Sequence, residues 1–521
     1  MKKIFFVSAL LISATLMAQE SINWFSAIES NASNGTKAVG ASGLASISAY
    51  EDGSIVAAAK FASCGLEPAT ATWLDKSFVG APFTVDQQTT NANLLISKIS
   101  KDGEVQWLLH SNRGNGEAVA IATADGGALV FAAVGHTDSD VQGDHKNLQL
   151  LNGENVLVSA THDFKKKELQ FGELVKVAAD GESAVLAGEL LNQGLDNDFT
   201  ALNWATDGTN YYLLLIVKNE VKFGETTLTP FEGGSLAILK FNEDGELLGS
   251  ALTDGKALTS TTSNLFCDGE KLYIGTVAAV DGVNSFLIET FGTDLAFVRE
   301  DIIKGVVVNN KNVLQLKKVF VKDGAVYVAG AVNGGIELEG GNLENSANKN
   351  KAVVVKYDLA FGKATHAYLH GAGIGQISDM FTFGGGLFGF GYEMQKKDGE
   401  GIFFVQLDAN NLAAKDTVGL FITAGTETTW NAVEADGNIV FAANTAANSD
   451  LKFTADESKS VKTTTLSRIL ASVTLKAPKD EPTAIENTSL KATKAQKVVR
   501  DGQIIIIRDG KTFNALGAQI D

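Results

Sequence analysis

The chain has 521 residues, of which 45% are hydrophobic and 20% are charged, so it can bury a large core and is not broadly disordered. Acidic residues outnumber basic ones by 61 to 43, which gives a net charge of −18. This excludes a general binder of nucleic acids or of anionic membranes, because phosphate binding needs a basic surface. Two cysteines, Cys64 and Cys267, are too few for a disulfide framework or a cysteine-based zinc module. They form either one long-range bridge or two buried thiols.

Residues 1–18 have the layout of a secretory signal peptide. Lys2 and Lys3 form a basic start, residues 4–16 are apolar, and Ala18 is the small residue before the expected cut. The apolar stretch is shorter than the roughly 20 residues that a transmembrane helix needs, and no other stretch reaches that length without charges. We therefore expect an exported protein, at the cell surface or outside the cell, with the periplasm as the alternative. We expect no transmembrane segment in the mature chain.

A turn followed by a short apolar strand recurs through residues 19–476. Asp-Gly and Gly-Gly turns supply the positive φ angles that tight hairpins need. A second apolar strand follows most of the turns, and its copies are 49 to 80 residues apart, the size of one four-stranded propeller blade. The turns lie at Asp52, Asp125, Asp180, Asp207, Asp268, Asp323, Gly384 and Asp436, and the second strands are anchored at Lys98, Ala160, Lys240, Glu289, Lys356, Gln406 and Ser472.

This repeat predicts an all-β fold, a β-propeller of seven blades. The turn at Asp180 has no second strand of its own before Asp207. It marks either an insertion or a decayed blade, so eight blades are the alternative.

The two ends of the array predict ring closure. Ile22–Trp24 precedes the turn at Asp52 as Val105–Trp107 precedes the turn at Asp125, so the array starts in the middle of a blade. The last copy, Ile469–Lys476, also stops in the middle of a blade. Pairing these two pieces would complete one blade and remove two exposed sheet edges.

Two segments carry a resemblance to a known family. Asn93–His145 resembles the propeller-type repeats of bacterial secreted proteins, with a lysine-bearing strand, Asp-Gly, a tryptophan strand and Asp-Gly-Gly. The segment that starts at Val221 is similar to another version of the same repeat. The resemblance implies the architecture of residues 19–476 and no particular activity, because propellers host enzymes, binders and scaffolds.

One acidic loop within the array is a candidate Ca²⁺ site. Asp138, Asp140 and Asp144 alternate with other residues around Gly143, and hard carboxylate oxygens are the ligands that Ca²⁺ prefers. Gln149 stands where an EF-hand has its bidentate glutamate, so an EF-hand is rejected. A solvated acidic loop is the alternative.

The histidines give little sign of chemistry. His366 and His370 have the spacing of a zinc pair on a helix, but their segment reads as a strand. We see no nucleophile elbow and no cysteine–histidine arrangement in the sequence, and so we name no catalytic or cofactor-binding residue.

The C-terminal segment differs in composition from the array. Residues 477–490 contain Pro478 and Pro482 and read as a linker, and residues 491–521 read as two or three short β-strands. This tail resembles the C-terminal sorting domain of proteins exported by the type IX secretion system of some Gram-negative bacteria. The resemblance implies export across the outer membrane by that machinery. The residues that carry it are Asp501, Gly502, Arg508, Asp509, Gly510, Lys511 and Gly517.

These observations favour an exported propeller that binds a protein or a glycan, or serves as a scaffold, without catalysis. A secreted glycan lyase or hydrolase that uses carboxylates at the propeller channel is one alternative, since such chemistry needs only a pair of carboxylates at a set distance. A structural component of the cell envelope is the other.

Overall fold

The structure is a computed structural model, and it divides into two units, Met1–Pro478 and Lys479–Asp521. It describes residues 21–476, apart from gaps, and three strands between residues 496 and 514. All of the described elements are β-strands, which confirms the all-β part of the predicted fold class. The gaps are 28, 31–32, 35–36, 39–45, 64–69, 74–75, 80–90, 115, 135–146, 162–170, 193–198, 254–261, 396–398, 424–427, 446–449, 454–455 and 463–466.

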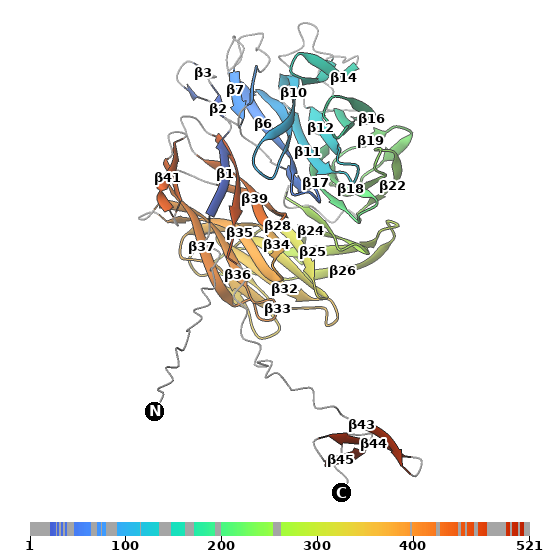
Figure 1. The fold of residues 1–521 in the computed structure, drawn as a ribbon, viewed down its shortest axis with the longest axis vertical. Coiled ribbons are helices and arrows are strands. Elements are labelled where there is room, and N and C mark those ends of the chain that lie inside the picture. Colours follow the sequence, from blue (N-terminus) through green and yellow to red (C-terminus); the bar gives the residue numbers. More distant parts are fainter. Residues whose placement is uncertain are drawn as a thin grey trace, which may run out of the picture. The chain divides into compact units, whose positions relative to one another are not determined.

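Seven antiparallel sheets share a four-stranded core (Figure 1). The first sheet has β5 (Ser46–Ala49), β6 (Ile55–Ser63), β9 (Asn91–Ile99) and β10 (Val105–Gly114), and it is extended by β13 (Asn147–Asn152) and β14 (Asn155–Thr161). The second has β11 (Gly116–Ala122), β12 (Ala128–Val134), β15 (Phe171–Val177) and β16 (Ala184–Asn192), extended by β19 (Val221–Phe223) and β20 (Thr226–Leu228). The third has β17 (Phe199–Thr206), β18 (Tyr211–Val217), β21 (Ser235–Phe241) and β22 (Leu247–Leu252).

The remaining four sheets repeat this plan. The fourth has β23 (Asn264–Cys267), β24 (Lys271–Val280), β25 (Val283–Gly292) and β26 (Phe297–Ile303). The fifth has β28 (Val313–Lys322), β29 (Ala325–Asn333), β32 (Lys351–Asp358) and β33 (Lys363–Leu369). The sixth has β34 (Ile374–Phe383), β35 (Gly386–Gln395), β36 (Gly399–Leu407) and β37 (Ala414–Thr423), extended by β40 (Asp450–Phe453) and β41 (Asp456–Lys462). The seventh has β38 (Thr428–Ala435), β39 (Asn438–Thr445), β42 (Ser467–Thr474) and β1 (Ser21–Ala27).

Four small sheets complete the described strands. One joins β2 (Glu29–Ser30), β7 (Thr70–Trp73) and β8 (Lys76–Val79), and another joins β3 (Ser33–Asn34) and β4 (Lys37–Ala38). A third joins β27 (Gly305–Val306), β30 (Gly335–Ile336) and β31 (Leu343–Glu344). In the C-terminal unit, β43 (Gln496–Arg500), β44 (Gln503–Arg508) and β45 (Lys511–Asn514) form an antiparallel meander.

The first strands of the seven sheets contact one another in chain order. β5 contacts β11, and the series continues through β17, β23, β28 and β34 to β38. β38 then contacts β5, so the series returns to its start. We call these seven strands the inner strands.

The pairing of the two chain ends is confirmed. β1 lies antiparallel to β42, with Trp24 opposite Ser472 and Phe25 opposite Ala471. β42 pairs on its other side with β39, so the N-terminal strand completes a four-stranded sheet whose other strands come from residues 428–474.

Two assignments within the second repeat were wrong. Ala160, taken as the anchor of the second strand there, lies in β14, which pairs with β13 at the edge of the first sheet. The equivalent third strand of the second sheet is β15, which carries Lys176. The turn at Asp180 joins β15 to β16 within that sheet and is neither an insertion nor a separate blade.

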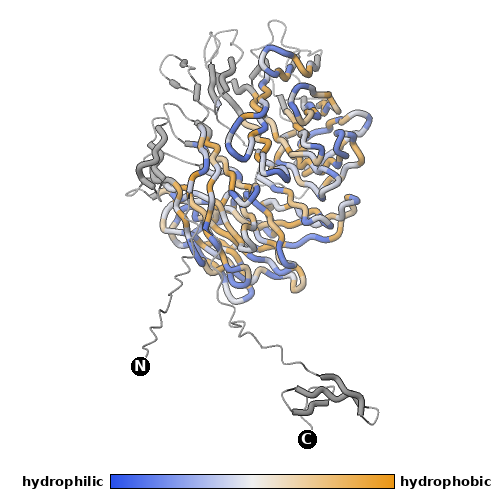
Figure 2. The backbone as a smooth tube through the Cα atoms, viewed as in Figure 1, coloured by the Kyte–Doolittle hydropathy of each residue, from blue (hydrophilic) through white to orange (hydrophobic). Residues whose placement is uncertain are grey.

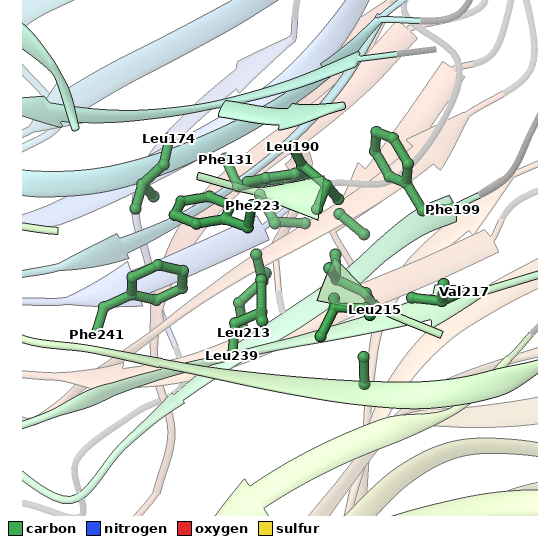
Figure 3. Close-up of a cluster of buried hydrophobic side chains, with 14 of the residues drawn as sticks. Phe131, Leu174, Leu190, Phe199, Leu213, Leu215, Val217, Phe223, Leu239 and Phe241 are labelled. Carbon is green, nitrogen blue, oxygen red and sulfur yellow. The ribbon is translucent and has the colours of Figure 1, made fainter. Parts of the chain in front are cut away.

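Apolar side chains fill the spaces between neighbouring sheets, and Figure 2 shows apolar residues along the strands of this unit. Figure 3 shows the cluster between the second and third sheets, where Phe131 and Phe199 pack edge to face with ring centres 6.2 Å apart. Phe223 and Phe241 pack in the same way at 5.4 Å. Each fully buried side chain of this kind stabilises the fold by roughly 1.5–3 kcal/mol.

Two Asp-Gly turns also hold their sheet to the one before it. Trp24 of β1 lies against Gly103 in the first sheet, where a Cβ atom would come within 2.6 Å of the indole. Trp107 of β10 lies in the same way against Gly181 in the second sheet, at 2.3 Å. Both glycines have positive φ, so glycine serves the turn and the close approach at once. The indole nitrogens of both tryptophans donate to a backbone oxygen of the same turn, Lys101 O and Ala179 O.

Candidate functional site

Exposed apolar side chains gather at one end of three consecutive outer strands. Leu248 lies at the start of β22, Phe297 and Val298 lie at the start of β26, and Phe361 lies in the turn before β33. Their exposed fractions are 51%, 57%, 51% and 74%. We call these four residues the apolar rim.

Two contacts join the three sheets near the turns that carry the apolar rim. A Cβ atom at Gly249 in β22 would lie 3.4 Å from Leu295 Cδ1, in the turn before β26. Arg299 Nη1, in β26, donates to Leu359 O, in the turn before β33, over 2.9 Å. The third, fourth and fifth sheets are therefore in contact near the ends of the outer strands that carry the apolar rim. Large exposed apolar side chains that cluster in this way mark interaction surfaces.

Exposed acidic residues lie in two of the three turns next to the apolar rim. Asp244 and Glu246 are exposed in the turn before β22, and Asp294 is exposed in the turn before β26. Lys363 is exposed beside Phe361, but its amine is 3.0 Å from Glu339, so its charge is balanced. A partner with an apolar centre and basic edges would complement this surface.

The inner strands carry polar side chains that bind the next sheet. Asn203 of β17 donates to Leu265 O and accepts from Leu265 N in β23. Asn264 accepts from Val319 N in β28. Ser46 of β5 donates to Ala120 O and accepts from Ala120 N in β11. These bonds satisfy backbone groups of the neighbouring inner strand and link the sheets to one another.

Between the fifth and sixth sheets, an ion pair links the two inner strands. Lys318 Nζ of β28 lies 2.9 Å from Asp379 Oδ1 of β34. Asp379 also accepts from Met380 N at 2.7 Å and, through Oδ2, from Ala432 N of β38 at 3.0 Å. Asp379 is 3% exposed. One buried carboxylate therefore holds three consecutive sheets together, and its oxygens are engaged by the protein.

A second polar cluster lies where β33 leads into β34. Tyr368 Oη lies 2.6 Å from His370 Nδ1, and His370 Nε2 lies 3.5 Å from Glu393 Oε2. His370 stacks on Phe403 with ring centres 3.9 Å apart. Gly373 N donates to Glu393 Oε1. Burial, with the charge of Glu393, raises the pKa of Tyr368 to about 12. Both ring nitrogens of the histidine are occupied, so the cluster holds a loop rather than presenting a free base.

One buried carboxylate has no partner among the described residues. Glu173 of β15 is fully buried, and neither of its carboxylate oxygens accepts a hydrogen bond there. It lies directly opposite Glu189 of β16. Burial, and then the charge of Glu189, raises the pKa of Glu173 to about 8.

Most residues singled out in the sequence lie outside the described residues. Asp138, Asp140 and Asp144 are among the residues that the structure does not describe, so the Ca²⁺ site stays a prediction. Over the described residues, no group of three potential metal ligands comes together. Of the sorting motif, Arg508 ends β44 and Lys511 begins β45, and the other residues are not described. Residues 1–18 are not described either.

The remaining expectations concern single residues. Cys267 is a free thiol in the structure, Cys64 lies outside the described residues, and burial raises the pKa of the Cys267 thiol to about 11. His366 lies in β33, which confirms the strand reading of its segment. No helix in the described part of the chain has the length and hydropathy of a membrane span.

Sequence reasoning missed the apolar rim and the Lys318–Asp379 pair. The rim has a weak local signal, because an apolar pair follows the turn in both Leu247–Leu248 and Phe297–Val298. The ion pair has none, since its partners are 61 residues apart and meet only when two sheets pack.

No family model matches the chain, and no curated protein matches it. Among solved structures, the chain is similar to a subtype N11 neuraminidase-like protein of the isolate A/flat-faced bat/Peru (H18N11), at 9% identity and a TM-score of 0.31, over 87% of this chain and 94% of that one. It is also similar to a subtype N10 neuraminidase-like protein of the isolate A/little yellow-shouldered bat/Guatemala, at 8% identity and a TM-score of 0.29, over 79% of this chain and 93% of that one. At these values the likeness carries no argument about activity.

Proposed function

We propose that the mature chain is a seven-bladed β-propeller that is exported to the cell surface or the surrounding medium and binds a partner protein there without catalysing a reaction. Seven four-stranded sheets whose inner strands contact one another in a returning series support the propeller. The basic and apolar start of the chain and the motif at residues 501–517 support export, with the type IX machinery as the route.

The apolar rim is the observation that carries the binding function. Four large apolar side chains, each at least half exposed, lie at the same end of the outer strands of three consecutive sheets. Leaving them in water is unfavourable, and covering them with a partner recovers that free energy. A protein is a better match than a glycan, because the rim offers aliphatic and phenyl groups surrounded by carboxylates rather than a row of polar groups.

The alternative of a glycan-active enzyme is less well supported. That chemistry needs two carboxylates facing an open site at a set distance. Asp379 is bonded to Lys318 and to two backbone amides, and Glu393 is bonded to Gly373 N and faces His370. Both carboxylates serve to join segments of the protein.

Site-specific cross-linking tests the binding function. The full chain, produced in its native host, carries a photoreactive phenylalanine analogue in place of Phe361, and a matched control carries it in place of Thr227, an exposed residue of β20. We expect one dominant cross-linked protein at position 361 and none at 227. With that protein purified, Phe297→Ser combined with Phe361→Ser should weaken binding at least about 30-fold, as loss of two interface anchors does. No cross-link at 361, equal cross-links at both positions, or unchanged binding would contradict the proposal.

A further inference from the structure

The carboxyl group of Glu173, on β15 of the second sheet, lies in the interior without a partner. The exposed fraction of this residue is 0%, and neither carboxyl oxygen has a hydrogen bond among the described residues. An ionised carboxylate that leaves water needs hydrogen bonds or a counter-charge, and a protonated one still needs an acceptor for its O–H group. The described residues therefore satisfy neither protonation state of Glu173.

A second carboxyl group stands directly opposite the first. Glu173 of β15 pairs in register with Glu189 of β16, which is partly exposed. Residues that pair in this way point to the same face of the sheet, with Cβ atoms about 4.5–5.5 Å apart. No hydrogen bond joins Glu173 to Glu189, so the two groups do not share a proton. The pair brings carboxyl oxygens from two strands to one place on the sheet.

The neighbouring strand offers Glu173 no compensation. On the other side of β15, β12 places Ala132 opposite Glu173, and alanine has no polar side-chain atom. Burial and the charge of Glu189 both oppose the ionised form, and they raise the pKa of Glu173 to about 8. Two like charges directly opposite each other destabilise a sheet. A bound cation would neutralise both carboxylates and give the oxygens of Glu173 a ligand.

We propose that Glu173 and Glu189 bind a Ca²⁺ ion on the face of the second sheet that they share. The two carboxylates balance its charge, and backbone oxygens and water complete the about six to eight oxygen ligands that Ca²⁺ takes. Water reaches the ion from the side of Glu189, which is partly exposed. Mg²⁺ fits less well, because it needs near-ideal octahedral geometry and keeps several waters, which conflicts with a fully buried ligand. The site uses no residue of the acidic loop at Asp138, Asp140 and Asp144.

Calorimetric titration of the mature chain with Ca²⁺ tests this site. The background variant carries Asp138→Asn, Asp140→Asn and Asp144→Asn, so that the acidic loop contributes no carboxylate. We expect this background to bind one Ca²⁺ ion per chain, and to bind Mg²⁺ at least about tenfold more weakly. Glu173→Gln and, separately, Glu189→Gln should each weaken Ca²⁺ binding at least about tenfold, because each removes one of the two negative charges.

Thermal melting provides the second readout and shows that the variants fold. Ca²⁺ at about a hundred times its dissociation constant should raise the melting temperature of the background by about 3 °C. Glu182→Gln, which removes an exposed carboxylate from the same sheet, is the matched control and should respond equally. Glu173→Gln should melt cooperatively without Ca²⁺ and should not respond to it. Absence of Ca²⁺ binding, unchanged binding in both Glu173→Gln and Glu189→Gln, or tighter binding of Mg²⁺ overturns the proposal.

Discussion

Replacing Asp379 by alanine should destabilise the large unit strongly, because Asp379 bonds three sheets at once. The change removes the partner of Lys318, whose side chain is 23% exposed, and leaves Met380 N and Ala432 N without their acceptor. Removing one partner of a buried ion pair costs about 3–5 kcal/mol, a large share of the roughly 5–15 kcal/mol of stability that a folded protein has.

The expected shift in melting temperature follows from the size of the unit. Unfolding entropy is about 2.1 cal/mol/K per residue, so a unit of about 450 residues loses about 1 °C per kcal/mol, and Asp379→Ala should melt about 3–5 °C lower. Urea unfolding followed by circular dichroism checks the free energy directly. The double variant Lys318→Met with Asp379→Asn should recover part of the loss, since it leaves no unpaired charge.

An exposed ion pair provides the matched control. Glu339 pairs with Lys363 at 3.0 Å, and both side chains are more than half exposed. Glu339→Ala should therefore change the stability by less than about 1 kcal/mol. If Asp379→Ala is no more destabilising than Glu339→Ala, the idea that a buried carboxylate holds these three sheets together is refuted.

Three further predictions concern the chain ends and one buried acid. Mass spectrometry of the exported protein should show a start near Gln19, and retention of Lys2 and Lys3 would contradict a cleaved signal peptide. A chain without residues 483–521 should fold but remain in the periplasm, whereas normal surface delivery would remove the export role of the tail. Because burial raises the pKa of Glu173 to about 8, its ionisation opposes folding increasingly from about pH 4.5 to pH 8. Glu173→Gln should therefore gain stability over the wild-type chain as the pH rises through that range, by a few kcal/mol in urea unfolding, and a constant difference would contradict the assignment.

Local sequence patterns predicted the strands well where turn chemistry is explicit. Trp24 and Trp107 were matched from their positions before an Asp-Gly turn, and the structure gives them the same contact with a glycine of the next sheet. The pairing of β1 with β42 followed from counting incomplete repeats, because an unpaired strand at each end has a physical cost.

The errors arose where local signals cannot distinguish two apolar strands. β14 follows an Asn-Gly turn and reads like a repeat strand, but it pairs with β13 at the edge of the first sheet. Whether β14 or β15 is the third strand of the second sheet depends on which of them pairs with β12. That pairing is a long-range contact, and β15 makes it. The apolar rim and the Lys318–Asp379 pair have the same origin, since exposure and ion pairing between sheets exist only after the sheets pack.

The central claim is that the two chain ends pair with each other and thereby close the series of sheets. A pair of truncated chains tests this claim most directly. β42 lies between β39 and β1, and its residues Ile469, Leu470 and Val473, followed by Leu475, are at most 3% exposed. At roughly 1.5–3 kcal/mol for each buried side chain, these four contribute about 6–12 kcal/mol, comparable with the stability of the whole unit. In thermal melting, a chain that ends at residue 478 should match the full-length protein, and one that ends at residue 464 should aggregate or lose its cooperative transition. Equal melting of the two chains would contradict the closure.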